Sequence, residues 1–377
     1  MINEKHKLAF LFFLFSRILF SFIMGAFLLF VCLTLTSCEE KNNILGDYGV
    51  INEQGEWIVE PRYTQISTTY SQGKLAVRDP ERYPRSGYID KDGNWSIEPQ
   101  FDSVTSFSSK GLAVVGASGP DKLYGFIDEQ GNWVIEPKYR ILDSISSNGL
   151  IVAQLPDSEL YGYIDKSGKW VIKPQLGFSN TFSDIGLAGV EDTETDLFGY
   201  IDESGEWVIE PQFKWAHDFS SNGFASVQDP KTELYGIIDT SGSWVAKPQF
   251  ESVSAARNGE KWATDSKTKL SGIIDEKGNW IIQPKYPKIT APFIDDVIAV
   301  QDLESELFGF IDRNENWVVE PQFKVITGRY EEGALIAAKD NESELWGYIN
   351  LAGEWVIKPQ FTTARSFAEG RGVVSLQ

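Results

Sequence analysis

The chain has 377 residues, of which 42% are hydrophobic and 13% are aromatic, and its formal charge is −20. This hydrophobic content is enough to form a buried core, which excludes a chain that is disordered throughout. Nucleic-acid binding draws most of its affinity from basic side chains that neutralise phosphates, so the acidic balance argues against a nucleic-acid partner.

Residues 1–37 have the pattern of a secretory signal peptide, in which basic residues precede an apolar stretch over residues 18–35. The following Leu35-Thr36-Ser37-Cys38 resembles the bacterial lipobox. The resemblance implies that residues 1–37 are removed and that Cys38 is the lipid-attachment site, with acyl chains that hold the protein on a membrane. An uncleaved transmembrane helix is the alternative, because the apolar stretch is just long enough to span a bilayer.

Cleavage before Cys38 would leave Cys38 as the only cysteine of the mature chain, since Cys32 lies in the removed segment. This excludes a disulfide or a thiolate zinc site, and stability must come from packing. Losing three basic residues and one acidic residue would change the formal charge from −20 to −22. Residues 38–46 would then be the lipidated cysteine and a linker. Glu39 and Glu40 resemble the surface-export signals of some Bacteroidetes lipoproteins, so we expect an extracytoplasmic location in the envelope of a Gram-negative bacterium, at the outer membrane or cell surface.

Residues 47–377 consist of nine copies of one unit. Nine tryptophans recur at spacings of 36 to 38 residues, and each has a glycine eight residues before it and a proline four residues after it. Self-similarity at such a period indicates a repeat array. The nine tryptophans are Trp57, Trp95, Trp133, Trp170, Trp207, Trp244, Trp280, Trp317 and Trp355.

Each unit begins with a predicted strand, such as residues 124–127, that is rich in aromatic and β-branched residues. The next four residues, Asp128-Glu129-Gln130-Gly131, predict a tight hairpin with a bulge at the glycine. Asn52 and Asn350 replace the aspartate in the first and ninth copies. Asn314-Glu315 stands at the glycine position of the eighth copy, which predicts a strained or rebuilt turn there.

The return strand of the unit has the pattern Trp-Val-Ile-x-Pro. Trp133 and Ile135 are expected on one face and Val134 on the other, with Pro137 where the strand ends, bends or forms an edge. A third strand follows, as in residues 223–227. The link before it is the longest and least patterned part of the unit, so we expect the crossover between units there. The motif tryptophans are expected to be buried between neighbouring units.

The core Gly-x-Ile-[Asp/Asn]…Trp-[Val/Ile]-x-x-Pro resembles the WG-containing repeat, also called the KWG repeat. The Trp-Gly pair itself occurs at Trp346-Gly347; six copies have Tyr or Phe before the glycine, and Ser86 and Ser271 take that place in the second and seventh. The resemblance implies an all-β module with no settled activity. We predict an all-β tandem array of nine three-stranded repeats of about 37 residues, an open solenoid or superhelix in preference to a closed β-propeller ring, because no N-terminal strand obviously completes the last unit.

The sequence offers no catalytic residue, no cofactor site and no metal site. His217, beside Trp215, is interpreted as a surface histidine and not as a general base. Asp90-Lys91-Asp92-Gly93 is similar to the start of a calcium loop but lacks the later ligands, so it is interpreted as a turn. The repeated aspartates, such as Asp128, are explained by turn chemistry and not by a glycosidase pair.

We therefore expect a non-catalytic scaffold that binds a protein or a glycan, with the membrane as a second partner through the lipid. A purely structural envelope protein and a glycan-directed hydrolase are the alternatives. The variable segments 214–218 and 258–262 are expected to supply specificity. The aromatic residues of the first strands are candidates for a sugar-stacking ladder, although packing between repeats is the expected role. The tryptophans outside the motif, Trp215, Trp262 and Trp346, are expected to be exposed.

Overall fold

The computed structural model describes residues 48–68, 70–80, 85–119, 121–254, 259–290, 296–327 and 335–376. The predicted signal peptide, the predicted lipid-attachment residue Cys38 and the predicted linker at 38–46 lie outside the described residues. The segment from Leu45 to Gln377 forms one compact unit. Among the described residues, no helix is long and apolar enough to cross a membrane.

The strands follow one another as nine antiparallel meanders, each of up to four strands. In sequence they are β1 (Tyr48–Ile51), β2 (Trp57–Tyr63), β3 (Gln65–Ile66), β4 (Leu75–Asp79), β5 (Arg85–Ile89), β6 (Trp95–Phe101), β7 (Ser103–Val104), β8 (Ala113–Gly116), β9 (Tyr124–Ile127), β10 (Trp133–Tyr139), β11 (Ile141–Ile145), β12 (Ile151–Gln154), β13 (Tyr161–Ile164), β14 (Trp170–Leu176), β15 (Ala188–Glu191), β16 (Phe198–Ile201), β17 (Trp207–Phe213), β18 (Trp215–Ala216), β19 (Phe224–Gln228), β20 (Tyr235–Asp239), β21 (Trp244–Val253), β22 (Glu260–Asp265), β23 (Ser271–Asp275), β24 (Trp280–Tyr286), β25 (Val297–Gln301), β26 (Phe308–Asp312), β27 (Trp317–Ile326), β28 (Ile336–Asp340), β29 (Trp346–Ile349), β30 (Trp355–Phe361), β31 (Thr363–Ala364) and β32 (Gly372–Ser375).

Each meander combines the second half of one repeat with the first half of the next. In the sheet β10-β9-β8-β7, strands β9 and β10 carry the motif of the third copy, whereas β7 and β8 follow the motif of the second. The two-residue strand β7 is an element that the three-stranded prediction did not include. Two residues carry too little periodicity to be recognised from sequence.

The predicted crossover is confirmed. Strand β6 ends one meander at Phe101, and β7 begins the next at Ser103. The long strands β21 and β27 make the same passage without a break, because each pairs first with the strand before it and then, through its last residues, with the strand after it. These continuous strands join two pairs of meanders into sheets of seven and six strands.

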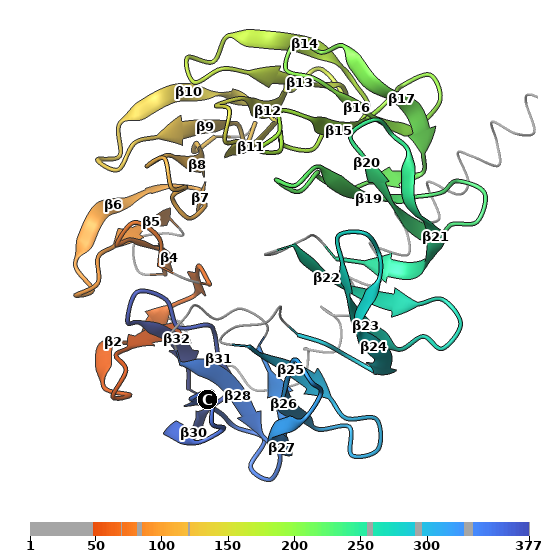
Figure 1. Cartoon of the computed structure of the whole chain (residues 1–377). Coiled ribbons are helices and arrows are strands. Elements are labelled where there is room, and N and C mark those ends of the chain that lie inside the picture. Colours follow the sequence, from red (N-terminus) through yellow and green to blue (C-terminus); the bar gives the residue numbers. More distant parts are fainter. Residues whose placement is uncertain are drawn as a thin grey trace, which may run out of the picture. The chain divides into compact units, whose positions relative to one another are not determined.

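The two ends of the repeat array complete one sheet, in the order β2-β1-β32-β31. Strand β1 pairs antiparallel with β32, and Val50 lies opposite Val373. The array therefore closes on itself, and its sheets follow one another around a circle (Figure 1). The preference for an open solenoid was wrong, and the ring is the observed architecture. Because every meander is shared by two repeats, the first repeat supplies the half that the last repeat lacks.

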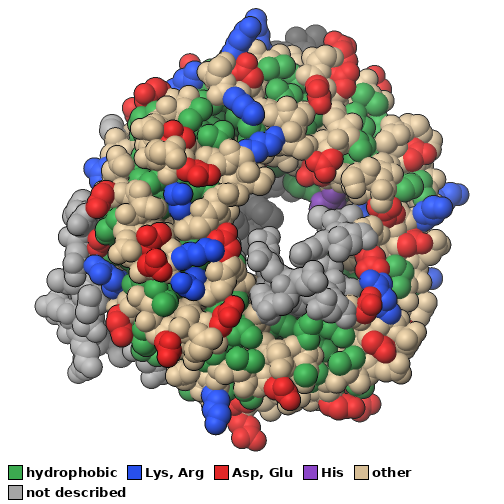
Figure 2. Space-filling model, turned by 60° about the vertical axis from the view of Figure 1, so that its left-hand side comes forward, with side chains coloured by type: hydrophobic (Ala, Val, Ile, Leu, Met, Phe, Trp, Pro, Cys, Tyr) green, Lys and Arg blue, Asp and Glu red, His purple; other side chains and the backbone are tan. Residues whose placement is uncertain are grey.

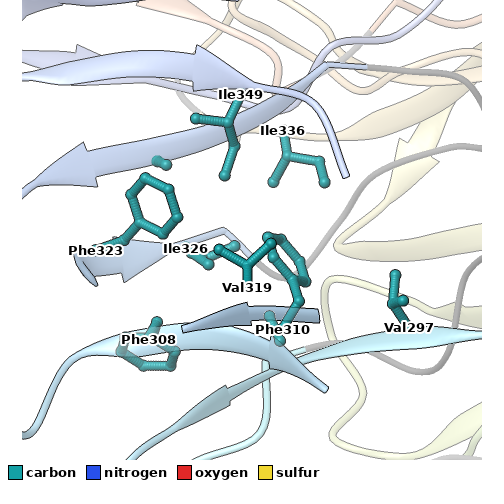
Figure 3. Close-up of a cluster of buried hydrophobic side chains, with 10 residues drawn as sticks. Val297, Phe308, Phe310, Val319, Phe323, Ile326, Ile336 and Ile349 are labelled. Atoms are coloured by element: carbon teal, nitrogen blue, oxygen red, sulfur yellow. The ribbon is translucent and has the colours of Figure 1, made fainter. Parts of the chain in front are cut away.

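The hydrophobic core lies between neighbouring meanders. In the cluster of Figure 3, Phe310 and Phe323 from β26 and β27 pack with Ile336 and Ile349 from β28 and β29. A corresponding cluster lies across the closing sheet, where Ile51 of β1 packs with Tyr348 of β29. Each meander thus buries its apolar faces on both neighbours, as expected of repeat units.

The fixed spacing of glycine, tryptophan and proline reflects a close approach of the outer strand to the motif glycine. A Cβ atom on Gly199 would lie 2.4 Å from the carbonyl oxygen of Ile209, 2.8 Å from the nitrogen of Pro211 and 2.8 Å from Cζ3 of Trp207. The pairing of β16 with β17 shifts register on both sides of Tyr200, so the outer strand bulges toward the glycine. Proline fits because the outer strand is an edge and needs no donor there.

The motif tryptophans lie between neighbouring meanders, but eight of the nine are half-buried and one is exposed, so they are not buried as predicted. The edge of Trp133 contacts Phe101 of the preceding meander in a T-shaped pair, with ring centroids 5.6 Å apart. The indole covers the rim of the interface and leaves part of its ring in solvent. Trp244 is the most open of them, at 38% exposure.

The predicted hairpin turns are confirmed. The Asp128 Oδ1 atom accepts hydrogen bonds from the backbone N–H groups of Gln130 and Asn132, at 3.0 and 2.8 Å. Asp90 makes the same two bonds within its own turn, at 2.9 Å each. In the eighth copy, Glu315 has a φ of 64° and donates its N–H to the Asp312 carbonyl, so the turn is retained and not rebuilt. The strain of a left-handed non-glycine residue, about 1 kcal/mol, remains there.

Candidate functional site

A polar residue comes at the end of the innermost strand of most meanders. In eight copies the residue at this position donates its backbone N–H to a carbonyl of the neighbouring strand. All eight side chains are polar although they come from different sequence contexts, so the inner edge of the ring is a polar surface. The eight are Ser67, Thr105, Asn180, His217, Ser254, Thr290, Thr327 and Arg365.

One place in the strand next to these residues breaks the repeat symmetry. Lys261 is 2% exposed and its Nζ atom donates to Oγ of Ser226, itself fully buried, over 3.0 Å. Burial lowers the pKa of Lys261 to about 8, and the charge of Glu276 opposes the shift. Strand pairing places an aliphatic residue or glycine at the corresponding position in the other copies: Leu75, Ala113, Ile151, Ala188, Ala225, Ile298, Ile336 and Gly372.

Residues of the two variable segments expected to supply specificity, 214–218 and 258–262, both bond to Ser226. Ser226 accepts from Lys261 through its hydroxyl, and its carbonyl accepts the backbone N–H of His217 at 3.0 Å. His217 is half-buried, and burial together with the charge of Lys261 lowers its pKa. His217 is thus a partly exposed histidine, less open than the surface position expected of it. Beside it, the surrounding protein and the carboxylate of Asp143 raise the pKa of Asp218 to about 6, although Asp218 itself is solvent-exposed.

Replacing Lys261 with isoleucine, the residue found at Ile151, should stabilise the protein at pH 7 by roughly 1–3 kcal/mol, since a buried charge is removed. The folded-state pKa of about 8 lies below the ordinary 10.5, so the unfolded state binds the proton more tightly between these values. The stability of the wild type should therefore rise from pH 8 to 10.5 relative to Lys261→Ile, which denaturation at each pH measures. Exposed Lys173→Gln is the control, and a pH-independent difference for Lys261→Ile would contradict the assignment.

Pockets open where serine replaces the aromatic residue before the motif glycine. We call them the Ser86 pocket, with a volume of about 380 Å³, and the Ser271 pocket, of about 420 Å³. In the other seven copies the position carries an aromatic ring. In the fifth copy this ring packs on a neighbouring indole, with the ring centroids of Phe198 and Trp215 4.9 Å apart. Serine does not fill this volume, and each of the two serines lines a hollow in the ring surface.

The Ser86 pocket lies among the closing meander and the next two. It is lined mainly by polar side chains. They are Tyr48, Thr64, Gln65, Ser67, Arg78, Ser86, Ser103 and Arg365, with Ile66, Ala76, Val77 and Val104 as the apolar part. A second hollow of about 430 Å³, which we call the Lys122 pocket, shares Arg78 and Ser103 with it. The Lys122 pocket adds Arg85, Asp102, Lys122 and Tyr124.

The Ser271 pocket has a different character. Trp262 lines it with 36% of its surface exposed, and Thr290 Oγ1 is buried there without a hydrogen-bond partner among the described residues. Of the three tryptophans outside the motif, Trp262 is thus the one whose expected exposure is confirmed, because Trp215 and Trp346 are half-buried. Sequence analysis missed both serine pockets, although the serines themselves were the visible signal.

The described residues contain no group of three or more His, Cys, Asp or Glu side chains able to hold a metal ion. Acidic and basic side chains are interspersed over the face seen in Figure 2, which is hollowed around its centre. Of the three pockets described above, the Ser86 and Lys122 pockets adjoin each other, and the Ser271 pocket shares no lining residue with them.

A closed ring of radial antiparallel meanders, completed by pairing of the two chain ends, defines a β-propeller, here with nine blades. The family described as WG containing repeat matches nine segments of the chain, and the protein belongs to this family. The segments are residues 48–79, 87–116, 124–155, 161–192, 198–229, 235–263, 272–302, 308–342 and 346–376.

One solved structure supports the fold, and a second is similar only in part. A structure titled as the eukaryotic initiation factor aligns over 88% of this chain and 98% of its own with a TM-score of 0.58 at 9% identity. Hsv2 from Kluyveromyces lactis aligns over 75% of this chain and 96% of its own, with a TM-score of 0.40 at 10% identity. None of the curated proteins matches the chain.

Proposed function

We propose that this propeller is a non-catalytic scaffold, anchored in the cell envelope by lipid on Cys38, that binds a protein or glycan ligand in its surface pockets. The observation that carries the proposal is that both serines found before the motif glycine line a pocket. The motif residues are used in turns and in packing between blades, whereas Ser86 and Ser271 depart from the motif and each lines a hollow. Departure from a structural consensus at a surface is where ligand specificity is expected.

Burial argues against catalysis at the one nucleophile-like arrangement described above. A serine hydroxyl 3.0 Å from a lysine amine of lowered pKa is the combination that Ser-Lys enzymes use. Here Ser226 is fully buried and Lys261 is 2% exposed, so a substrate carbonyl has no route to the hydroxyl. The pair acts in packing between two blades.

The anchor rests on the lipobox resemblance of Leu35-Thr36-Ser37-Cys38. Each buried methylene contributes about 0.8 kcal/mol, so several acyl chains hold a protein on a membrane durably. The short segment 38–46 would then place the propeller close to the membrane surface, in reach of envelope ligands.

In cells supplied with an alkyne fatty acid, the full-length protein should incorporate the label and fractionate with membranes, and Cys38→Ala should lose the label. Mass spectrometry of an unmodified Cys38 in the processed chain would contradict the anchor. The same purified protein should turn over no glycan, peptide or ester in a broad hydrolase panel. Reproducible turnover that disappears on mutating one Asp–Glu pair would overturn the non-catalytic assignment.

A further inference from the structure

We infer that the joined Ser86 and Lys122 pockets form a binding site for an anionic saccharide, one whose sugar units carry carboxylates. This inference rests on the proposed binding function and names its ligand class. It starts from a local reversal of charge. In a chain of formal charge −20, the described lining of the two pockets has four basic side chains and one carboxylate. The basic residues are Arg78, Arg85, Lys122 and Arg365, and the carboxylate is Asp102.

The arginines are held in place mainly by neutral acceptors, which leave their charge available. Arg78 Nη1 donates to Gln65 Oε1 at 3.1 Å, and Arg365 Nη1 donates to the Ile66 carbonyl at 2.8 Å. The Arg365 guanidinium also lies over the Tyr48 ring, 4.8 Å from its centroid. These contacts fix the planar groups and do not neutralise them, which suits the recognition of carboxylates.

Arg85 is fixed in the same way and only weakly neutralised. Its Nη1 atom donates to the Gln100 carbonyl at 3.0 Å and lies 3.6 Å from Asp102 Oδ1. Asp102 Oδ1 also accepts from Ser118 Oγ at 2.9 Å, so the carboxylate is shared. Both members of the ion pair are solvent-exposed, and such pairs are weak. An anionic ligand can therefore compete for Arg85.

The uncharged lining favours a saccharide over an acidic peptide. Thr64, Gln65, Ser67, Ser86 and Ser103 place hydroxyl and amide groups around the Ser86 pocket, and the Tyr124 ring lines the Lys122 pocket. Hydroxyl-rich ligands use such groups for hydrogen bonds and aromatic rings for stacking. The two volumes, about 380 and 430 Å³, each reach the range of small-ligand sites, and they meet at Arg78 and Ser103, so a ligand of several linked units can occupy both.

The test is calorimetric titration of the full-length protein in detergent with tetramers of galacturonate, mannuronate and glucuronate. At least one should bind, its methyl ester should bind at least tenfold more weakly, and a tetraglutamate peptide should bind no better than the ester. Ser86→Tyr restores the ring found at Tyr124 and Tyr161 in other copies, so it should fold and should weaken binding at least tenfold. Arg78→Gln should weaken binding by roughly the same factor.

Two matched controls separate the site from general effects. Ser271→Tyr fills the other pocket, and Arg62→Gln removes the same charge from an outer strand, so both should leave binding unchanged. Failure of all three uronate tetramers, equal binding of the ester, or preference for tetraglutamate overturns the inference. Lipid labelling at Cys38 and the absence of turnover do not depend on these titrations, so the proposed function can stand or fall separately.

Discussion

Replacing Gly199 with alanine should destabilise the propeller by about 3 kcal/mol, a large effect for the addition of one methyl group. The new Cβ atom would lie 2.4 Å from the Ile209 carbonyl oxygen and 2.8 Å from the nitrogen of Pro211. Both atoms belong to the backbone of the adjacent strand, so no side-chain rotation relieves the clash. Strand β17 would have to separate from β16 and from the interface that it covers. Urea denaturation followed by tryptophan fluorescence measures the loss.

Gly119→Ala is the matched control, because a Cβ there meets no atom within 4 Å among the described residues. It should change stability by less than about 0.5 kcal/mol. A loss below about 1 kcal/mol for Gly199→Ala would show that the outer strand does not approach the glycine as described, and the explanation of the repeated glycine would fail with it.

Ile51→Asp in the closing strand should destabilise the protein by about 4 kcal/mol, because it places an unpaired carboxylate in a fully buried position. Ile51 lies opposite Gly372 in the pairing that closes the ring, and it packs with Tyr348 of the preceding meander. Ile238→Asp, at the corresponding position of the sixth meander, is equally buried and should cost a similar amount. Chemical denaturation of the two variants compares the closing blade with an internal one.

This comparison tests closure itself. In an open array, the face of β1 that packs on β29 would lie in solvent, and Ile51→Asp would cost much less than Ile238→Asp. Val134→Asp, at an outer-strand position that is 41% exposed, should change stability by less than about 0.5 kcal/mol. An Ile51→Asp loss near that of Val134→Asp would contradict a closed ring.

Local structure was predictable wherever a short pattern has one physical solution. The Asp128 turn and the alternation of Trp133, Val134 and Ile135 follow from hydrogen-bond geometry and from the two-residue period of a strand. Closure was not predictable in this way. The pairing of β1 with β32 joins residues more than 300 positions apart, and no local pattern shows which partner completes an edge.

The candidate site was predictable only in part. Ser86 and Ser271 were visible departures from the repeat, but their consequence depends on the ring that other copies place there and on the blade opposite. The same holds for Lys261, whose burial follows from a register that only strand pairing reveals. The motif tryptophans were expected to be buried because of their size, whereas their place at the rim of the blade interface leaves them half-exposed.

The sharing of each blade by two repeats affects how such a gene can change length. Recombination that deletes or duplicates one whole period of about 37 residues leaves an N-terminal half-blade that still matches the C-terminal one. The sequence across the recombination junction keeps the normal order of the repeat, whichever position within the period recombines. Ring size can therefore change by single blades without a new closing contact, with blade curvature as the remaining limit, and the number of repeats becomes a heritable variable that selection can act on.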